Sequence, residues 1–419
     1  CDNTHIYEPN KDGIYGAFNN DFPTKVKTMS SRSLAYVGLG DALDEAELTT
    51  QNEIEQIEGP VFYRSDIGKS KYSLAGVNID TATNALNDMK DMIKSTYNNN
   101  VGGSFGDFGG SYHLDTDILE GINGMKAPVN PNTGKSCFTL VSSTDGVGTK
   151  SIMIQKLIKD KHQAMNILGQ DLVNHSINDI LVQGASPLFF LDYYASSKLE
   201  PEKLKGFISG IVESCKKYSC VLIGGETAEM PNVYLPERED LVGTIVGIKN
   251  IDIDYSRISE NNIAIAIPSD SPHTNGYSLI RKVLDNYYSS EGLTQNKEIQ
   301  SIEKDLCIPH RCYLPEILQL ITNNIKINGL CHITGGGLID NPVRIIPKNL
   351  KIVYENLESK IPPIYKILQK DGRIELEELM RVFNCGIGMM IIIPKSDEPK
   401  VLELLNDAYY LGHIETNII

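Results

Sequence analysis

Several short segments of the sequence combine glycine with acidic or hydroxyl side chains, a composition suited to phosphates and divalent cations. The first covers residues 101–110, where five of nine consecutive positions are glycine. Glycine lets backbone N–H groups approach phosphate oxygens closely. The segment lacks the Gly-Lys-Ser/Thr ending of a Walker loop, and no strand directly precedes it, so a plain loop explains it equally well. Its glycines are Gly102, Gly103, Gly106, Gly109 and Gly110.

The second segment, residues 144–150, follows an apolar run that predicts a strand. Asp145 at the end of a strand is suited to binding Mg²⁺, and Lys150, five residues later, is suited to neutralising phosphate charge. The alternative is an Asp-Gly turn followed by a solvated lysine.

The third set of residues lies on a predicted helix at residues 166–180. Asp171 is seven residues before Asn178 and eight before Asp179, so the three fall near one helical face. Such a row of oxygen atoms predicts a Mg²⁺-binding surface, although a solvated polar face has the same spacing. The intervening His175 is interpreted as a polar or capping histidine.

Three further turns follow predicted strands. Residues 223–231 contain Gly-Gly and two carboxylates, of which Glu226 is the candidate metal ligand, with a plain solvated turn as the alternative. In the second half, His273 is a candidate acid or base, with a hydrogen-bonded loop histidine as the alternative. The hydroxyl, amide and glycine residues of these later turns are Thr274, Asn275, Gly276, Thr334, Gly335 and Gly336. Cys385 is interpreted as a packed thiol because no histidine lies near it in sequence.

Strands and helices must alternate to present these turns. Short apolar runs predict strands at 137–142, 188–194, 221–223, 263–267, 329–333 and 389–393. Helical spacing predicts helices at 79–97 and 166–180. This alternation indicates an α/β (α+β) fold. A polar segment at 249–262 predicts the domain boundary.

Composition excludes several classes of function. The 419 residues carry a formal net charge of −15, which argues against a nonspecific nucleic-acid or acidic-membrane binder. No apolar run approaches the roughly 20 residues of a membrane helix. The eight cysteines contain no C-x-x-C pair, which favours free thiols and a cytoplasmic location.

Taken together and in this order, the motifs resemble the aminoimidazole ribonucleotide synthetase (phosphoribosylformylglycinamidine cyclo-ligase) family of purine biosynthesis. The resemblance is dense at residues 143–150, 169–194, 224–231, 273–281, 332–338 and 383–389. It implies ATP-dependent ring closure of formylglycinamidine ribonucleotide, with Mg²⁺. It also implies a homodimer in which the sheets of the N-terminal domains, residues 70–250, form a shared barrel, followed by a C-terminal α/β domain at 251–419.

The resemblance also implies roles for individual residues. The glycine segment and Asn178 would bind ATP. Asp145, Asp171, Asp179 and Glu226 would bind Mg²⁺, and catalysis would involve Asp145, Lys150, Asp171 and His273. The turns containing His273–Gly276 and Thr334–Gly336 would bind the substrate. Residues 310–313 and 341–344 depart from the usual family forms.

Residues 1–69 lie outside that resemblance. Segments 31–41 and 62–68 resemble the C-terminal end of glycinamide ribonucleotide synthetase, an ATP-grasp enzyme. We therefore expect a fragment of a fused, multifunctional purine enzyme; a decorative extension is the alternative. A catalytically silent scaffold of the same fold is the alternative function, and the retained acidic residues argue against it.

Overall fold

The computed structural model describes residues 5–6, 14–18, 34–36, 38–41, 43–54, 88–99, 101–102, 111–112, 139–288 and 294–417. Two compact units divide the chain, Cys1–Val77 and Asn78–Ile419. The first contains a three-stranded antiparallel sheet and a helix: β1 (His5–Ile6), β2 (Ile14–Phe18), β3 (Leu34–Tyr36) and α1 (Leu43–Ile54). The N–H of Gly38 donates to Thr50 Oγ1 at 3.0 Å and so ties the preceding turn to α1.

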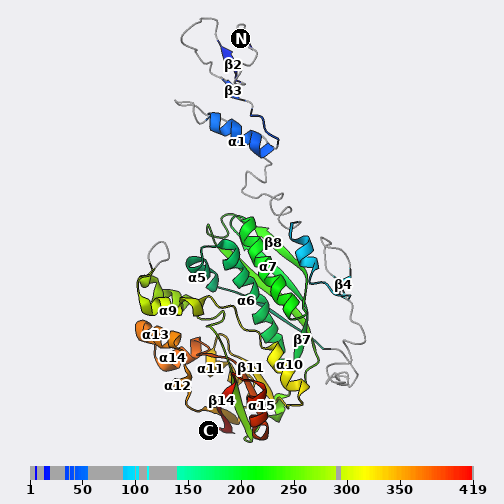
Figure 1. The fold of residues 1–419 in the computed structure, drawn as a ribbon, viewed down its shortest axis with the longest axis vertical. Coiled ribbons are helices and arrows are strands. Elements are labelled where there is room, and N and C mark those ends of the chain that lie inside the picture. Colours follow the sequence, from blue (N-terminus) through cyan, green and yellow to red (C-terminus); the bar gives the residue numbers. More distant parts are fainter. Residues whose placement is uncertain are drawn as a thin grey trace. The chain divides into compact units, whose positions relative to one another are not determined.

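The first large sheet of the second unit has the order β6-β9-β7-β8. Its strands are β6 (Leu140–Gly146), β7 (Ala185–Ser196), β8 (Val221–Glu229) and β9 (Glu239–Lys249). Only β7 and β8 pair in parallel. Three helices accompany this sheet, namely α5 (Lys150–Leu157), α6 (Lys161–Leu181) and α7 (Pro201–Lys217), and α6 and α7 lie side by side over it (Figure 1). Residues 88–94 are also helical, and β4 (Val101–Gly102) pairs with β5 (Ser111–Tyr112).

Glycines allow α6 and α7 to pack at backbone distance. A Cβ on Gly169 of α6 would overlap the carbonyl oxygen of Phe207. On α7, a Cβ on Gly210 would overlap the carbonyl oxygen of Asn166. Because any larger residue would push the helices apart, these glycines fix how closely α7 lies against α6, the helix that carries most of the candidate site.

The second large sheet is entirely antiparallel, in the order β11-β13-β10-β14-β12. Its strands are β10 (Asn262–Pro268), β11 (Gly329–His332), β12 (Leu350–Tyr354), β13 (Ile387–Pro394) and β14 (Tyr409–Thr416). The helices around it are α8 (Tyr277–Leu284), α9 (Lys297–Leu306), α10 (Leu314–Thr322), α11 (Gly337–Asp340), α12 (Leu357–Lys360), α13 (Pro363–Gly372), α14 (Leu376–Val382) and α15 (Glu398–Leu404). Short 3₁₀ helices lie at Tyr255–Arg257, Asp285–Tyr287, Pro342–Arg344 and Lys395–Asp397. The mixed α/β fold class is confirmed.

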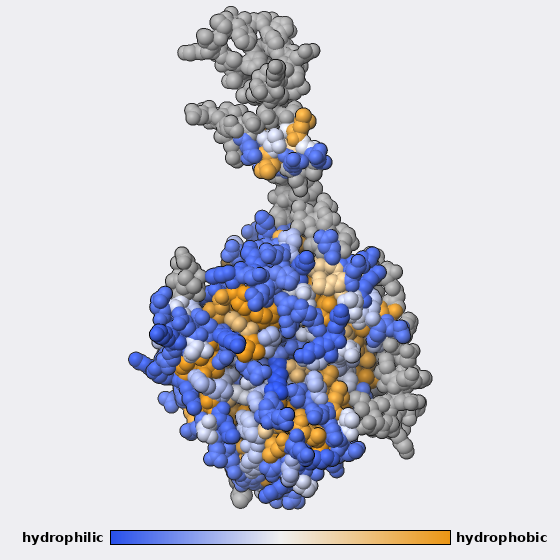
Figure 2. Space-filling model, in the orientation of Figure 1, coloured by the Kyte–Doolittle hydropathy of each residue, from blue (hydrophilic) through white to orange (hydrophobic). Residues whose placement is uncertain are grey.

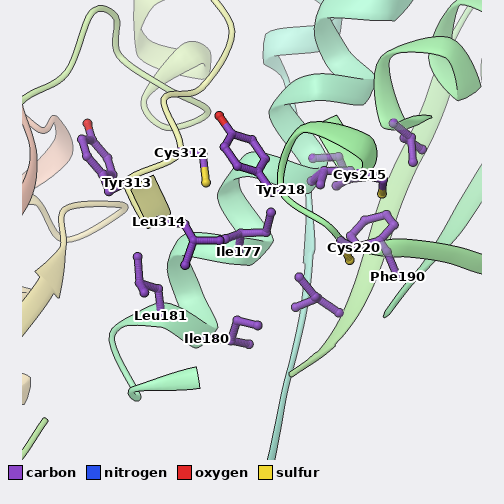
Figure 3. Close-up of a cluster of buried hydrophobic side chains, with 14 of the residues drawn as sticks. Ile177, Ile180, Leu181, Phe190, Cys215, Tyr218, Cys220, Cys312, Tyr313 and Leu314 are labelled. Carbon is purple, nitrogen blue, oxygen red and sulfur yellow. The ribbon is translucent and has the colours of Figure 1, made fainter. Parts of the chain in front are cut away.

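Buried apolar side chains join the two sheet regions. Cys312, Tyr313 and Leu314, from the segment that leads into α10, belong to the same buried cluster as Ile177 and Leu181 of α6 (Figure 3). At roughly 25 cal/mol per Å² of buried apolar surface, such contacts supply the main force holding the segment against α6. The segment therefore has a defined position beside the polar face of that helix.

Hydrophilic side chains cover much of the visible surface, with separate hydrophobic areas between them (Figure 2). Val233 and Leu235, between β8 and β9, are among the exposed large apolar residues. Within the described residues, no helix combines the length and the apolar character that crossing a membrane requires.

Candidate functional site

One face of α6 supplies the centre of the candidate site. Asp160 caps the helix by accepting a hydrogen bond from the N–H of Gln163 at 2.8 Å. Positions 171, 174, 175, 178 and 179 then recur at three- and four-residue intervals, which places them on one side of the helix. This face meets the end of β6 and the segment before α10.

Two carboxylates converge on one histidine of that face. The Nε2 of His175 lies 2.9 Å from Asp145 Oδ2 and 3.3 Å from Asp179 Oδ2. The N–H of Gly146 donates to Asp145 Oδ1 at 2.6 Å, and Ser143 Oγ donates to Asp179 Oδ2 at 3.2 Å. The side chain of Asp145 is 48% exposed and that of Asp179 25%, whereas His175 is buried. The structure thus brings together two of the four predicted metal ligands.

The charges of this group stabilise one another. Burial would lower the pKa of His175, but Asp145 and Asp179 outweigh it and raise that pKa to about 10. Burial would raise the pKa of Asp179, but His175 and His332 hold it far below its ordinary value. The pKa of Asp145 is likewise lowered, since His175 outweighs the effect of burial. At neutral pH the group therefore contains two carboxylates and an imidazolium.

A chain of hydrogen bonds continues from His175 into the second sheet region. Its Nδ1 lies 2.8 Å from Thr274 Oγ1, which is 3.5 Å from Nδ1 of His310. The Nε2 of His310 lies 3.0 Å from Nε2 of His332, and Nδ1 of His332 lies 2.9 Å from Asp179 Oδ1. Because the chain returns to Asp179, these polar groups form a closed ring between α6, the turn before α8 and β11.

His273 lies against this ring but is fully buried. Its imidazole stacks on that of His310, with ring centroids 3.8 Å apart and an interplanar angle of 19°. Its Nε2 lies 3.3 Å from the hydroxyl of Tyr313, and its backbone has a φ of 61°, in the left-handed region. Burial and the neighbouring histidines lower the pKa of His273 well below its usual value. The predicted acid or base is therefore a neutral, enclosed imidazole in this structure.

Lys150 and Asp171, both predicted to act at the phosphates, form an ion pair with each other. The Lys150 Nζ lies 2.8 Å from Asp171 Oδ1, and both side chains are 0% exposed. Lys150 also donates to the carbonyl of Ile308 at 2.9 Å, and the N–H of His310 donates to Asp171 Oδ1 at 2.6 Å. The structure therefore separates Asp171 from the partly exposed carboxylates of Asp145 and Asp179.

Asn178, predicted to bind ATP, has both amide atoms engaged with backbone. Its Nδ2 donates to the carbonyl of Arg311 at 2.8 Å, and its Oδ1 accepts from the N–H of Tyr313 at 2.9 Å. Asn174 similarly donates to the carbonyl of His310 at 2.6 Å. These two side chains fix the segment before α10 to α6.

Glu226 is not grouped with the other predicted ligands. Across the sheet, Asp145 pairs with Gly243, and Gly243 pairs with Asp192, so Asp145 and Asp192 share one face. Glu226 pairs with Tyr193, one position further along, and its side chain projects from the opposite face. In this chain Glu226 and Asp145 therefore lie on opposite sides of the first sheet.

The two predicted substrate turns lie beside each other. Gly276, with a φ of 79°, precedes α8, and Gly336, with a φ of 106°, precedes α11. A Cβ on Gly335 would lie 3.3 Å from Oδ1 of Asn275. The Thr334 N–H donates to Asn341 Oδ1 at 2.9 Å, which holds this turn in place. The structure thus brings Thr274, Asn275 and Gly276 close to Thr334, Gly335 and Gly336.

The glycine segment is described only in part. Gly102 ends β4 and pairs with Ser111, while Gly103, Gly106, Gly109 and Gly110 lie outside the described residues. The assignment of this segment to ATP remains a prediction.

The sequence interpretation missed the role of His175 and did not include His310 or His332 among the site residues. The signal for His175 was its position four residues before Asp179 on the polar side of α6. His310 and His332 are 22 residues apart in sequence, so no local spacing relates them.

The donor atoms of Asp145 and Asp179 fit Mg²⁺ in chemical type. Two partly exposed carboxylates already share a positive partner, the ring of His175. Mg²⁺ prefers carboxylate oxygens together with water and phosphate oxygens. These two residues would hold the ion, which would neutralise phosphate charge there.

Comparisons with known proteins match most of the second unit. The family model described as AIR synthase related protein, N-terminal domain, matches residues 131–249, and that of the C-terminal domain matches residues 259–417. The phosphoribosylformylglycinamidine cyclo-ligase of Geotalea uraniireducens is 40% identical over 353 residues, which cover 82% of this chain and 94% of the relative. The protein of that name from Finegoldia magna is 39% identical over 336 residues, which cover 80% and 92%.

Solved structures share the fold at low identity. Hydrogenase maturation protein HypE in complex with ATP has a TM-score of 0.52 at 14% identity, covering 79% of this chain and 86% of that one. Thiamine-monophosphate kinase from Stenotrophomonas maltophilia has a TM-score of 0.53 at 13% identity, covering 78% and 93%. These likenesses concern the fold alone.

Proposed function

The chain belongs to the family of AIR synthase related proteins, and from this premise we propose that it is a phosphoribosylformylglycinamidine cyclo-ligase. The reaction is the ATP-dependent closure of formylglycinamidine ribonucleotide to 5-aminoimidazole ribonucleotide in purine biosynthesis, with release of ADP and phosphate. One observation carries the proposal: a relative of that name is 40% identical across 94% of its own length.

In the proposed reaction, the formyl amide oxygen of the substrate attacks the γ-phosphorus of ATP, and ADP leaves. An amidine nitrogen then attacks the activated carbon, and phosphate leaves as the imidazole ring closes. Phosphoryl transfer depends mainly on positioning and on neutralising charge. We expect Asp145 and Asp179 to contribute to this neutralisation, which is supported by their partial exposure and by the contact that both make with His175.

The adjacent turns at 274–276 and 334–336 are proposed to bind the ribonucleotide. Both contain glycine in left-handed conformations and expose backbone next to hydroxyl and amide side chains. Thr149 Oγ1 lies 2.9 Å from Ser278 Oγ, which connects the turn after Asp145 with the start of α8. The substrate would thus lie within reach of the carboxylates.

The remaining expectations are proposals of the same kind. The chain would act as a cytoplasmic homodimer, and the exposed Val233 and Leu235 beside the first sheet are suited to burial in such an interface.

Residues 1–69 are proposed to be the C-terminal part of a glycinamide ribonucleotide synthetase-like enzyme.

The test is incubation of the full chain with ATP, Mg²⁺ and formylglycinamidine ribonucleotide. We expect one ADP and one aminoimidazole ribonucleotide per ATP consumed, measured by chromatography. ATP turnover without imidazole would overturn the substrate assignment, and no turnover of either compound would favour the silent scaffold.

A further inference from the structure

Three histidines from distant parts of the sequence meet in the interior of the second unit. His273 lies in the turn between β10 and α8, His310 in the segment between α9 and α10, and His332 at the end of β11. One ring nitrogen from each lies within 4.8 Å of the others. Their exposed fractions are 0%, 0% and 6%. We call these three residues the histidine triad.

The hydrogen bonds of the triad indicate where its lone pairs lie. His332 uses Nδ1 toward the carboxylate of Asp179 at 2.9 Å, so that nitrogen carries the proton and Nε2 has the lone pair. The Nε2 of His310 lies only 3.0 Å from Nε2 of His332, the nitrogen that has the lone pair. In the metal-free chain, His310 therefore carries a proton on Nε2 and donates it in a hydrogen bond to Nε2 of His332.

The same reasoning applies to His273. The hydroxyl of Tyr313 lies 3.0 Å from the carbonyl oxygen of Pro268, an acceptor, and must donate to it. Its oxygen therefore accepts from Nε2–H of His273, 3.3 Å away, which leaves the lone pair on Nδ1. That Nδ1 is buried and has no hydrogen-bond partner among the described residues. An unpaired acceptor in the interior costs free energy, and a cation would remove the cost.

We propose that the histidine triad binds one transition-metal ion of the Zn²⁺ or Co²⁺ type, separate from the Mg²⁺ of the proposed reaction. Imidazole nitrogens favour such ions, whereas Mg²⁺ favours oxygen. Two nitrogens on a tetrahedral ion with Zn–N bonds of about 2.0–2.1 Å are about 3.3 Å apart, close to the present contact between His310 and His332. When the ion takes the place of the proton between those two rings, His310 loses the proton on Nε2 and takes one up on Nδ1, beside Thr274 Oγ1, so its imidazole stays neutral.

Two further features define the site. Asp179 accepts from the far nitrogen of His332, the carboxylate–histidine–metal arrangement that orients ligating imidazoles. The parallel stacking of His273 and His310 directs their in-plane lone pairs along different lines, so His273 must turn about its side-chain torsions to complete the site. Water fills the fourth position. Because the three ligands come from separate segments, the bound ion also stabilises the chain against unfolding.

The test uses the full chain without a histidine tag, stripped with a chelator and then titrated with Co²⁺ in the absence of ATP. We expect one Co²⁺ per chain, with the visible absorption of a four-coordinate ion, and a rise in Tm. Zn²⁺ should displace Co²⁺ and abolish the absorption, while excess Mg²⁺ should not. A spectrum of six-coordinate cobalt, or displacement by Mg²⁺, would overturn the proposal.

Variants assign the ligands. His310→Asn and His332→Asn should each weaken Co²⁺ binding at least tenfold, whereas His413→Asn, a partly exposed histidine paired with Glu355, should leave it unchanged. Equal binding by His310→Asn and the unaltered chain would refute the assignment. If the variants fail to fold, X-ray absorption of the Zn²⁺-loaded native chain decides, since it counts imidazole ligands directly. Fewer than three imidazoles there would exclude the triad as the ligand set. None of these measurements depends on cyclo-ligase activity, so the two proposals fail independently.

Discussion

The ammonium of Lys150 lies 2.8 Å from the carboxylate of Asp171, and solvent reaches neither side chain. Lys150 begins α5, whereas Asp171 lies in the middle of α6, 21 residues later. The backbone of Ile308 and His310 completes the hydrogen bonding. This ion pair therefore links the first sheet region to the segment that carries one of the three clustered histidines.

Removing one partner of this pair should destabilise the fold. For Lys150→Met we expect the free energy of unfolding to fall by about 3–5 kcal/mol, because Asp171 would remain buried without a counter-charge. Combining it with Asp171→Leu should recover part of the loss. Lys370→Met, which removes an exposed pair with Glu298, should cost less than about 1 kcal/mol in denaturant unfolding. A similarly small loss for Lys150→Met would mean that the buried pair does not hold the structure together.

Asp145 should matter for turnover more than for stability. Asp145→Asn removes one of the two carboxylates next to His175, and we expect kcat to fall about 100-fold or more if Asp145 positions the phosphates. Since Asp145 is 48% exposed and His175 keeps Asp179, unfolding should change by less than about 1 kcal/mol. The exposed Glu260→Gln is the matched control. Parallel losses of kcat and stability would make Asp145 a structural residue.

Asn178 should show the reverse behaviour. Asn178→Ala leaves the carbonyl of Arg311 and the N–H of Tyr313 without their partner, and we expect a loss of about 2–4 kcal/mol in unfolding free energy. Gln163→Ala, at an exposed position of α6, serves as the control and should cost less than about 1 kcal/mol. An unchanged stability combined with a raised KM for ATP would instead support Asn178 as a nucleotide ligand.

Asp192 should make stability depend on pH. Burial, together with the nearby charge of Glu226, raises its pKa to about 7 from an ordinary value of 3.8. The folded state thus keeps a proton that the unfolded state releases, so the contribution of Asp192 falls as pH rises from about 4 to 7 and is constant above that. Asp192→Asn cannot ionise and should be more stable at pH 8 by up to about 4 kcal/mol, with little difference at pH 4.

Denaturant unfolding at a series of pH values would measure this effect. Asp88→Asn, at an exposed position, should give parallel curves with the unaltered chain. An identical pH dependence in Asp192→Asn and the unaltered chain would show that Asp192 ionises normally in the folded state.

The sequence by itself determined the local elements and the type of chemistry. The apolar run at 389–393 predicts the interior strand β13, and the seven- and eight-residue spacings from Asp171 place Asn178 and Asp179 on one face of α6. These features depend on neighbours within two turns of helix or on alternation along a strand, so they can be read along the chain. The resemblance to one enzyme family likewise rests on motifs that are continuous in sequence.

Only the tertiary structure decided which side chains meet. It pairs Lys150 with Asp171, places Glu226 on the face of the sheet opposite Asp145, and brings His310 to within 3.0 Å of His332. Each relationship depends on strand register or on how one element packs against another. Register and packing are set by burial summed over many distant residues, and no spacing along the chain records that sum.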